Sequence, residues 1–230
     1  MGVSPSMPRS NGISAGSSPG REPRPNGLAR PRWAAAATIC LIAAVLGFLS
    51  ALAPWWFLTT TTAGSSTMVG YLPGTAVEVV TNGGGGRTTY SGSGVPSVGA
   101  LYGFVLAAEL AVSVVALLLS AQAFASALGR WASPRILRTA RAATIGALAI
   151  GVLLLVVVPT LQPTLYRTDN PAGACSSTHP VGPCEAFWGS GTTSGGATEW
   201  GAGSGWWLDL AVSALWGISL LLQRRRSPSP

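Results

Sequence analysis

Four long apolar runs, separated by polar segments, dominate the pattern of this chain. They cover residues 33–58, 98–128, 142–161 and 206–223. A helix needs about 20 predominantly apolar residues to cross the hydrocarbon core of a bilayer. The fourth run is the shortest, but tryptophans precede it and arginines follow it, as at the two ends of a membrane span. The pattern predicts an all-α membrane protein, a four-transmembrane-helix bundle.

The first run ends in the sequence SALAPWWFLTTTT, which could mark either a signal-peptide cleavage site or a membrane exit. The apolar core of a signal peptide has about 7–15 residues, and the run up to Ala53 is longer. Pro54 would also lie directly after the scissile bond. We therefore expect the first helix to be retained. Tryptophans at both outer helix ends are expected to anchor the protein at the membrane interface: Trp55, Trp56, Trp206 and Trp207.

The arginines predict the orientation of the spans. Twelve of the fourteen lie before the first run, between the second and third runs, or after the fourth, and only Arg87 and Arg167 lie in the other segments. Positive residues are enriched in cytoplasmic segments, so a cell-membrane protein with both termini in the cytoplasm is expected. The arginines nearest the spans are Arg30, Arg32, Arg130, Arg135, Arg138, Arg141, Arg224, Arg225 and Arg226.

The two outside segments differ in character. The first contains TAVEVVT, an Asn-Gly turn and RTTY, which is a hairpin signal. It predicts a small extracytoplasmic β-rich cap, whereas the second segment, rich in Gly, Ser and Thr, is expected to be irregular. The Pro-, Ser- and Arg-rich N-terminus is expected to be a disordered tail. The resulting division is 1–32 (cytoplasmic tail), 33–58 (helix), 59–97 (β-capable segment), 98–128 (helix), 129–141 (cytoplasmic link), 142–161 (helix), 162–205 (outside loop), 206–223 (helix) and 224–230 (tail).

The composition agrees with a membrane protein and excludes several classes of function. Only 9% of the 230 residues are charged, against about 25% in soluble domains. The net charge of +7 does not indicate nucleic-acid binding, because the arginines cluster beside apolar runs. The chain has no Walker loop, dinucleotide fingerprint, HExxH or paired CxxC motif. We therefore expect a non-enzymatic protein without cofactor or metal, whose partners are the lipid bilayer and another membrane protein.

Three cysteines occur, two of them in the second outside segment. Cys175 and Cys184 enclose the sequence SSTHPVGP and would face an oxidising compartment, so we expect a disulfide between them. Two alternatives are a metal site that also uses His179 and a thiol-redox role, but three ligands without a spacing motif make a weak metal site. Cys40 is expected to be a small buried packing residue.

Two acids lie inside apolar runs. Glu109 in the second run and Asp209 in the fourth are both predicted near the outer membrane boundary and could share a level. The functional interpretation is an ion or proton site. The alternative, which the sequence favours, is a pair of interfacial acids bonded to water, to hydroxyl groups or to Arg167. A conducting path would usually show polar groups at several depths, and the first and third runs have no ionisable group at mid-depth apart from the thiol of Cys40.

Small residues recur four apart in every run, among them Gly47 and Gly151, and predict close helix packing. The layout of four spans, cytoplasmic ends and a β-capable first outside segment resembles that of tetraspan proteins such as claudins. Claudins carry a cysteine pair in the first outside segment behind a Trp-containing motif, whereas here the cysteines lie in the second. The resemblance is one of architecture, and it implies no function for this chain.

The function expected from the sequence is interaction. The absence of catalytic motifs predicts a non-enzymatic multi-pass protein that acts through its extracytoplasmic segments, on a partner protein or on envelope material. The alternative is a small transporter or channel component that uses the acids near the outer boundary.

Overall fold

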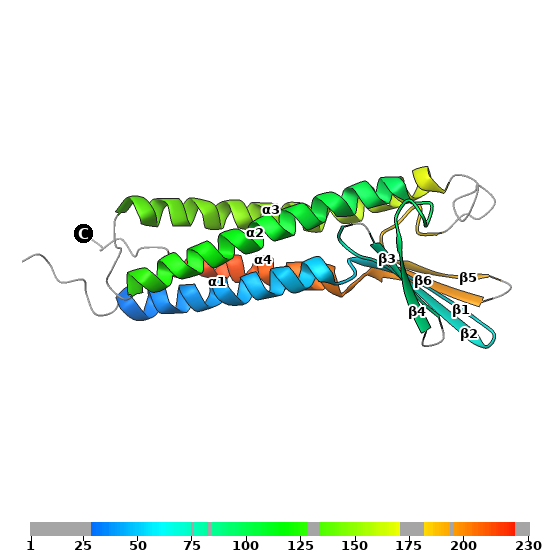
Figure 1. Cartoon of the computed structure of the whole chain (residues 1–230), viewed down its shortest axis with the longest axis horizontal. Helices are drawn as coiled ribbons and strands as arrows, with labels where there is room; N and C mark the ends of the chain where they lie inside the picture. Colours follow the sequence, from blue (N-terminus) through cyan, green and yellow to red (C-terminus); the bar gives the residue numbers. More distant parts are fainter. Residues whose placement is uncertain are drawn as a thin grey trace, which may run out of the picture.

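The structure, a computed structural model, describes residues 29–74, 76–81, 84–127, 134–170, 182–193 and 196–223. Four long helices lie side by side at one end of the molecule, and an antiparallel β-sheet lies at the other (Figure 1). The predicted N-terminal tail up to residue 28, the predicted turn at 82–83, residues 128–133 between the second and third helices, Cys175 and the C-terminal arginines lie outside the described residues.

The helical part consists of α1 (Ala29–Leu52), α2 (Pro96–Ala127), α3 (Pro134–Asp169) and α4 (Ser204–Gln223). Each helix is long and apolar enough to cross a membrane. α1 packs against α2 and α4, and α3 packs against the same two helices. Large apolar side chains are exposed along the outside of the helices, as expected for surfaces in contact with lipid; they include Leu41, Val45, Phe104, Leu118, Val152, Val156 and Leu221.

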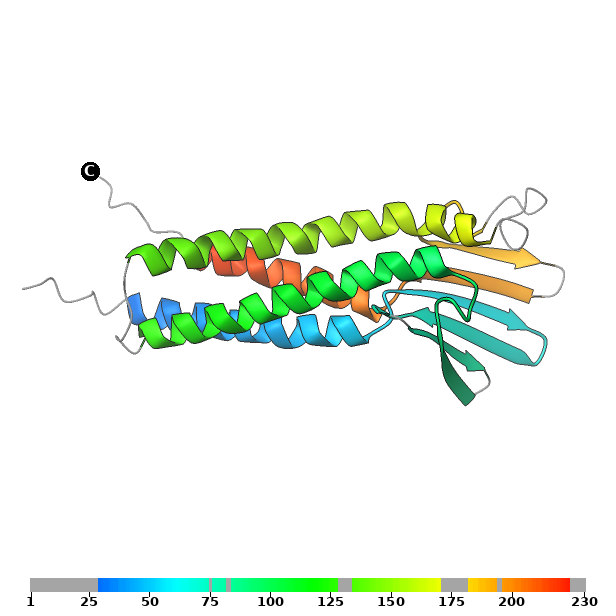
Figure 2. The same ribbon diagram turned by 45° about the horizontal axis from the view of Figure 1, so that its top comes forward.

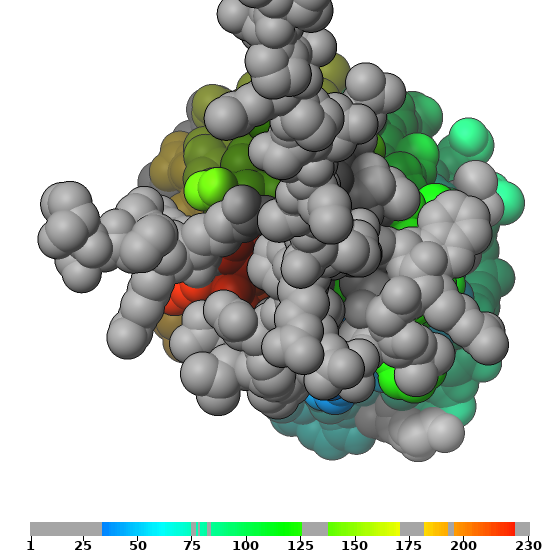
Figure 3. Space-filling model, turned by 90° about the vertical axis from the view of Figure 1, so that its left-hand side faces the viewer, coloured from blue at the N-terminus to red at the C-terminus, as the bar shows by residue number. Residues whose placement is uncertain are grey.

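The end opposite the sheet is where α1 begins, α2 ends, α3 begins and α4 ends (Figures 1 and 2). Seen from that end, atoms of α4 in red, α1 in blue and α2 and α3 in green lie around the grey atoms (Figure 3). The described arginines Arg138 and Arg141 belong to this end and are exposed.

The sheet has six strands in the order β4-β3-β2-β1-β6-β5. Its first four strands follow α1: β1 (Trp56–Thr62), β2 (Ser65–Tyr71), β3 (Ala76–Thr81) and β4 (Gly84–Thr89). The pairing of Ala76 with Thr89 and of Thr81 with Gly84 confirms the predicted β3–β4 hairpin.

The second outside segment is not irregular, and that prediction was wrong. α3 continues to Asp169, and β5 (Gly189–Thr193) and β6 (Gly196–Ala202) form a hairpin further on. β6 pairs along its whole length with β1. The residues of β6 have a weak intrinsic preference for strand, and β1 supplies the hydrogen-bond partner that makes them one. The sheet is thus larger than the small element predicted, and both outside segments contribute to it.

Two neighbouring strands, β1 and β6, are connected directly to helices. β6 ends at Ala202 and α4 begins at Ser204, while only three residues separate α1 from β1. Between them, the amide of Gly203 donates to Trp55 O (2.9 Å) and the amide of Gly205 donates to Pro54 O (2.8 Å). A Cβ atom at Gly203 would collide with Pro54 O, so this close backbone approach requires glycine.

The junction between sheet and helices is an aromatic core. The outer ends of α2 and α3 lie over one face of the sheet (Figure 2), and five rings meet between these layers: Trp56, Tyr71, Tyr90, Tyr102 and Tyr166. Neighbouring ring centroids lie 5.0 to 6.4 Å apart, within the range of favourable aromatic pairs. Burial raises the pKa of both Tyr71 and Tyr90 well above the usual 10.0.

Asp169 joins the outer ends of α3 and α2. Its carboxylate accepts hydrogen bonds from the amides of Ser97 (3.1 Å) and Val98 (3.0 Å) in the first turn of α2. These amides have no partner within their own helix, and a carboxylate there also interacts favourably with the helix dipole. The last residue of one helix thus caps the beginning of another.

Candidate functional site

Glu109 and Asp209 face each other between α2 and α4. The two carboxyl groups lie within reach of each other, and each residue is 1% exposed. Asp209 lies five residues into α4, about 8 Å along its axis. The pair is therefore enclosed by protein near the outer end of the helices, and the structure brings together the two acids singled out from the sequence.

The closeness of the carboxyl groups has a chemical consequence. An ionised carboxylate can only accept hydrogen bonds, so a hydrogen bond between the two groups requires a proton on one of them. Oε2 of Glu109 and Oδ2 of Asp209 are buried without a partner in the described part of the chain. A fully ionised pair in this low-dielectric setting would carry a large desolvation cost, so the geometry favours bound protons.

A glycine and a serine accompany each acid. Gly47 of α1 lies against Ser113 of α2, where an added Cβ would collide with Ser113 Oγ and lie 3.5 Å from Glu109 Oε2. Gly151 of α3 lies against Ser213 in the same way, and its Cβ would lie 3.4 Å from Asp209 Oδ1. Neither serine hydroxyl has a hydrogen-bond partner among the described residues.

These two arrangements come from a repeat in the sequence. Residues 109–113 read ELAVS and residues 209–213 read DLAVS, and the two segments have the same pattern of buried and exposed positions. The helix pairs α1–α2 and α3–α4 therefore present the same acid, serine and glycine to the centre of the helical part. The sequence analysis missed this repeat, although the shared LAVS at an interval of 100 residues was a readable signal.

On the side of the acids away from the sheet, buried or half-buried polar side chains continue along one face of α4. They recur at three- and four-residue intervals, which places them on one side of the helix over about 21 Å: Asp209, Ser213, Trp216, Ser219 and Gln223. At the inner end, Gln223 Nε2 donates to Ser219 Oγ (3.1 Å) and to Thr144 Oγ1 (3.3 Å). Cys40 Sγ lies 3.6 Å from Ser219 Oγ, so this thiol joins the polar network and does more than fill space.

Polar groups also lie on the outer side of the acids. Tyr102 Oη, both amide atoms of Gln162 and Trp206 Nε1 are buried without a partner in the described residues. Gln162 is 0% exposed although it belongs to an apolar helix. The sequence analysis considered only ionisable residues along the spans, and these hydroxyl, amide and indole groups add polar positions at other depths.

The predicted interface tryptophans have different surroundings. Trp55 and Trp56 are both 0% exposed, and Trp56 Nε1 donates to Phe187 O (2.8 Å) within the junction core. An interface anchor has to reach the bilayer, and these two indoles do not reach the molecular surface. Trp207 is 55% exposed and can do so, while Trp206 is partly buried between Trp188 and Trp207.

Only one cysteine of the predicted disulfide belongs to the described residues. Cys184 is buried near the end of α3, but Cys175 and His179 lie outside the described residues, so their pairing stays a prediction. Cys40 is a free, buried cysteine. Among the described residues, no group of three or more His, Cys, Asp or Glu side chains could hold a metal ion.

Comparisons with family models, with curated proteins and with solved structures find no match to this chain.

Proposed function

We propose that this chain is a non-enzymatic, multi-pass membrane protein that binds and transfers protons, as a small transporter or channel component. The observation that carries the proposal is that the carboxyl groups of Glu109 and Asp209 lie close together and buried inside the helical part. Burying an acid between apolar helices costs free energy, and intramembrane acids commonly mark proton or ion pathways. Two of them that share a proton form a site that can hold one proton and release another.

The polar groups above and below the pair support transfer as well as binding. Tyr102 and Gln162 lie toward the sheet, and the polar face of α4 leads to Ser219 and Gln223 at the opposite end. Hydroxyl, amide and indole groups can donate hydrogen bonds to a proton carrier such as water. The buried polar face of α4 covers about 21 Å, most of the roughly 30 Å hydrocarbon core.

Proton flux into liposomes tests this function. Purified protein is reconstituted with an internal pH-sensitive dye, and a potassium diffusion potential drives protons inward. We expect flux above that of protein-free liposomes, with most of it lost in Glu109→Gln and in Asp209→Asn. Glu199→Gln, an exposed acid on β6, is the matched control and should keep the wild-type rate. Equal flux in all four proteins, or none in the wild type, would refute the proposal.

Infrared spectroscopy tests the shared proton separately. A protonated carboxyl group absorbs at a different infrared frequency from a carboxylate. The wild-type protein should therefore show a protonated-carboxyl band at neutral pH. The band should be lost in Glu109→Gln combined with Asp209→Asn and kept in Glu199→Gln. Its absence from the wild type would show that the pair holds no proton.

A second candidate function is interaction through the sheet, and the size of the sheet favours it. Both outside segments combine in six strands, whose edge strands β4 and β5 have unpaired backbone groups that can bind an extended partner segment. Crosslinking from a photoreactive residue at exposed Thr192 on β5, compared with Thr164 on α3, tests this function. A partner captured at both positions or at neither would count against the sheet edge.

We further propose that the four helices form a transmembrane bundle with the sheet outside and both chain ends in the cytoplasm. Helix ends on one side of the molecule and the distribution of arginines support this orientation. Reporter fusions after Arg141 and Pro230 should report cytoplasm, and a fusion near Gly84 should report the outside. The same side for Gly84 and Pro230 would contradict the topology.

The predicted disulfide between Cys175 and Cys184 belongs to the same proposal. A closed loop of this length stabilises by roughly 2–3 kcal/mol in the chain-entropy model. Non-reducing peptide mapping should recover one crosslinked peptide and an alkylatable Cys40. Free thiols at both positions would leave the metal-site and thiol-redox alternatives open.

A further inference from the structure

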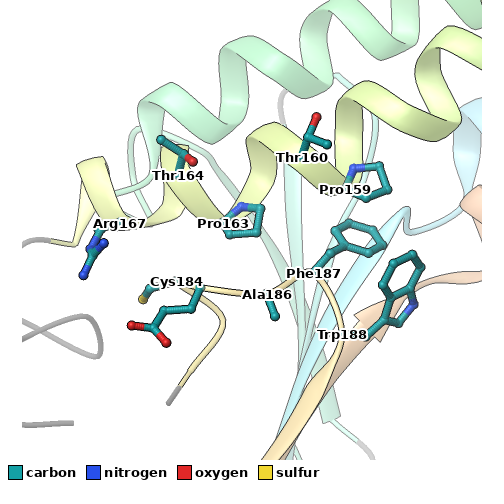
Figure 4. Close-up of a pocket in the computed structure, with 10 residues that line it drawn as sticks. Pro159, Thr160, Pro163, Thr164, Arg167, Cys184, Ala186, Phe187 and Trp188 are labelled. Atoms are coloured by element: carbon teal, nitrogen blue, oxygen red, sulfur yellow. The ribbon is translucent and has the colours of Figure 1, made fainter. Parts of the chain in front are cut away.

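A groove of about 610 Å³ lies beside the outer end of α3, away from the carboxyl pair (Figure 4). One wall is the last three turns of α3, from Pro159 to Arg167, and the other is the segment that leads into β5. Pro163 and Phe187 are buried and form its floor, and its rim is exposed. Prolines leave carbonyl groups of the preceding turn without their helical partners, which adds polar character to this part of α3.

The groove has a charged end and an apolar end. Arg167 and Cys184 lie toward one end, and Phe187 and Trp188 lie beside Pro159 at the other (Figure 4). Glu185, the residue that follows Cys184, also lines the groove. Pro159 and Arg167 are eight residues apart, which corresponds to about 12 Å along the helix. The groove is therefore amphiphilic along its length, with the charged groups on the side of the helix end and the apolar groups deeper along α3.

The groove lies at the level where the membrane should end. Counting about 20 residues from Arg141, the last arginine of the inner end, places the outer boundary near Leu161. Trp188 belongs to a row of indoles that continues through Trp206 to Trp207, with ring centroids 5.7 and 4.9 Å apart. Tryptophan is enriched at this level of the bilayer. The charged end thus lies at headgroup level and the apolar end at the level of the acyl chains.

We propose that this groove binds a zwitterionic phospholipid, with its phosphate at Arg167, its ammonium at Glu185 and an acyl chain along Phe187 and Trp188. Arginine is well suited to phosphate, and a carboxylate accepts hydrogen bonds from an ammonium group. A cation alone would favour an anionic lipid, but Glu185 repels one and attracts the ammonium of phosphatidylethanolamine. The inference rests on the proposal that α3 spans the membrane, and it does not depend on proton transfer.

Native mass spectrometry of protein released from nanodiscs tests the site. The discs contain equal amounts of phosphatidylethanolamine and phosphatidylglycerol, and the lipid that stays bound is counted. The wild-type protein should retain one phosphatidylethanolamine in preference to phosphatidylglycerol. Arg167→Ala should lower lipid retention roughly tenfold, because it removes the charge-assisted contact with phosphate. Glu185→Gln should still retain lipid but lose the preference for phosphatidylethanolamine.

Matched variants separate this result from a general change of surface charge. Arg87→Ala on β4 and Glu199→Gln on β6 remove the same charges from the sheet and should leave retention and preference unchanged. Trp188→Ala should lower retention of both lipids without changing the preference. An unchanged result for Arg167→Ala, a wild-type preference for phosphatidylglycerol, or no retained lipid would each overturn the proposal. Retained lipid with no proton flux would leave this site standing and refute only the transfer function.

Discussion

The sheet–helix junction and the interior of the helical part differ in how their buried polar groups are hydrogen-bonded. At the junction three aromatic residues have partners for their polar tips: Tyr90 Oη donates to Leu72 O (2.6 Å), Trp56 Nε1 to Phe187 O (2.8 Å) and Trp200 Nε1 to Ala186 O (3.0 Å). The hydroxyl of Tyr102, a residue of α2, is the exception. Among the helices, the hydroxyls of Ser113 and Ser213 and the indole nitrogen of Trp216 have none in the described residues. Buried polar groups without partners lower stability.

This contrast separates residues that hold the fold together from residues that a purely structural role does not explain. The junction resembles the core of a soluble domain, where most buried donors are satisfied. In the helical part the unpartnered hydroxyls of Ser113 and Ser213 each lie one helical turn from a buried acid. We therefore look for the function in the part of the molecule where buried polar groups lack hydrogen-bond partners.

The largest expected effect is at the junction. Trp56→Ala removes a completely buried ring and leaves Phe187 O without its donor. We expect the free energy of unfolding to fall by about 3–5 kcal/mol. Denaturant unfolding in detergent measures this loss. Trp207→Ala, at a 55% exposed position, is the control and should cost far less. Equal losses for the two variants would show that the junction is not a packed core.

The next effect is in the helical part. Gly47→Ala and Gly151→Ala place a Cβ against Ser113 and Ser213, and we expect each to destabilise by about 1–3 kcal/mol through overpacking. Gly103→Ala and Gly146→Ala are matched controls, because no neighbouring atom lies within 4 Å of their Cβ positions. They should be neutral or stabilising, since alanine has the higher helix propensity. Thermal denaturation in detergent distinguishes the two pairs, and the same result for both would contradict the close packing of α1 with α2 and of α3 with α4.

Two Tyr→Phe changes compare a hydroxyl that has a hydrogen-bond partner with one that has none. Tyr90→Phe leaves Leu72 O without a donor and should cost about 1–2 kcal/mol. Tyr102→Phe removes a buried hydroxyl that has no partner in the described residues, so it should be neutral or stabilising. Both variants lose one oxygen, and their rings lie 6.0 Å apart in the same core. A larger loss of stability for Tyr102→Phe would reverse our distinction between satisfied and unsatisfied groups.

The smallest expected effect is a change of stability at alkaline pH. Tyr71 and Tyr90 have pKa values in the folded protein above their ordinary value of 10.0, because burial disfavours the phenolate. Their contribution is complete below pH 10.0 and decreases above it, since the unfolded chain then releases protons that the folded chain keeps. Unfolding midpoints from neutral pH to pH 12, with tyrosinate absorbance recorded alongside, measure this decrease. In Tyr71→Phe combined with Tyr90→Phe the alkaline decrease should be smaller. A double variant with the same alkaline slope would exclude these two tyrosines as its source.

The sequence predicts a helix or strand when the residues that favour it lie within that element or next to it in the chain. The four helices follow from long apolar runs, and the β3–β4 hairpin follows from an Asn-Gly turn between β-branched residues. β5 and β6 could not be predicted, because their Gly- and Thr-rich residues form strands only when β1 supplies hydrogen-bond partners more than 130 residues away.

The site was predictable to a similar degree. Counting residues along two helices placed Glu109 and Asp209 at one level, but periodicity alone does not determine the rotation of each helix about its axis. Only the packing against α1 and α3, set by Gly47 and Gly151, turns both acids toward each other. The burial of Trp55 and Trp56 was missed for the same reason, since an outer helix end can face either lipid or an overlying sheet.

The short connections from α1 to β1 and from β6 to α4 give the molecule a mechanical property. No flexible linker separates β6 from α4, and Gly203 and Gly205 are hydrogen-bonded to the chain that leaves α1, so these two neighbouring strands are attached stiffly to two helices. A force that twists the sheet is transmitted to α1 and α4, and α4 carries Asp209. Tension on the outer face of the molecule would thus be felt at the carboxyl pair.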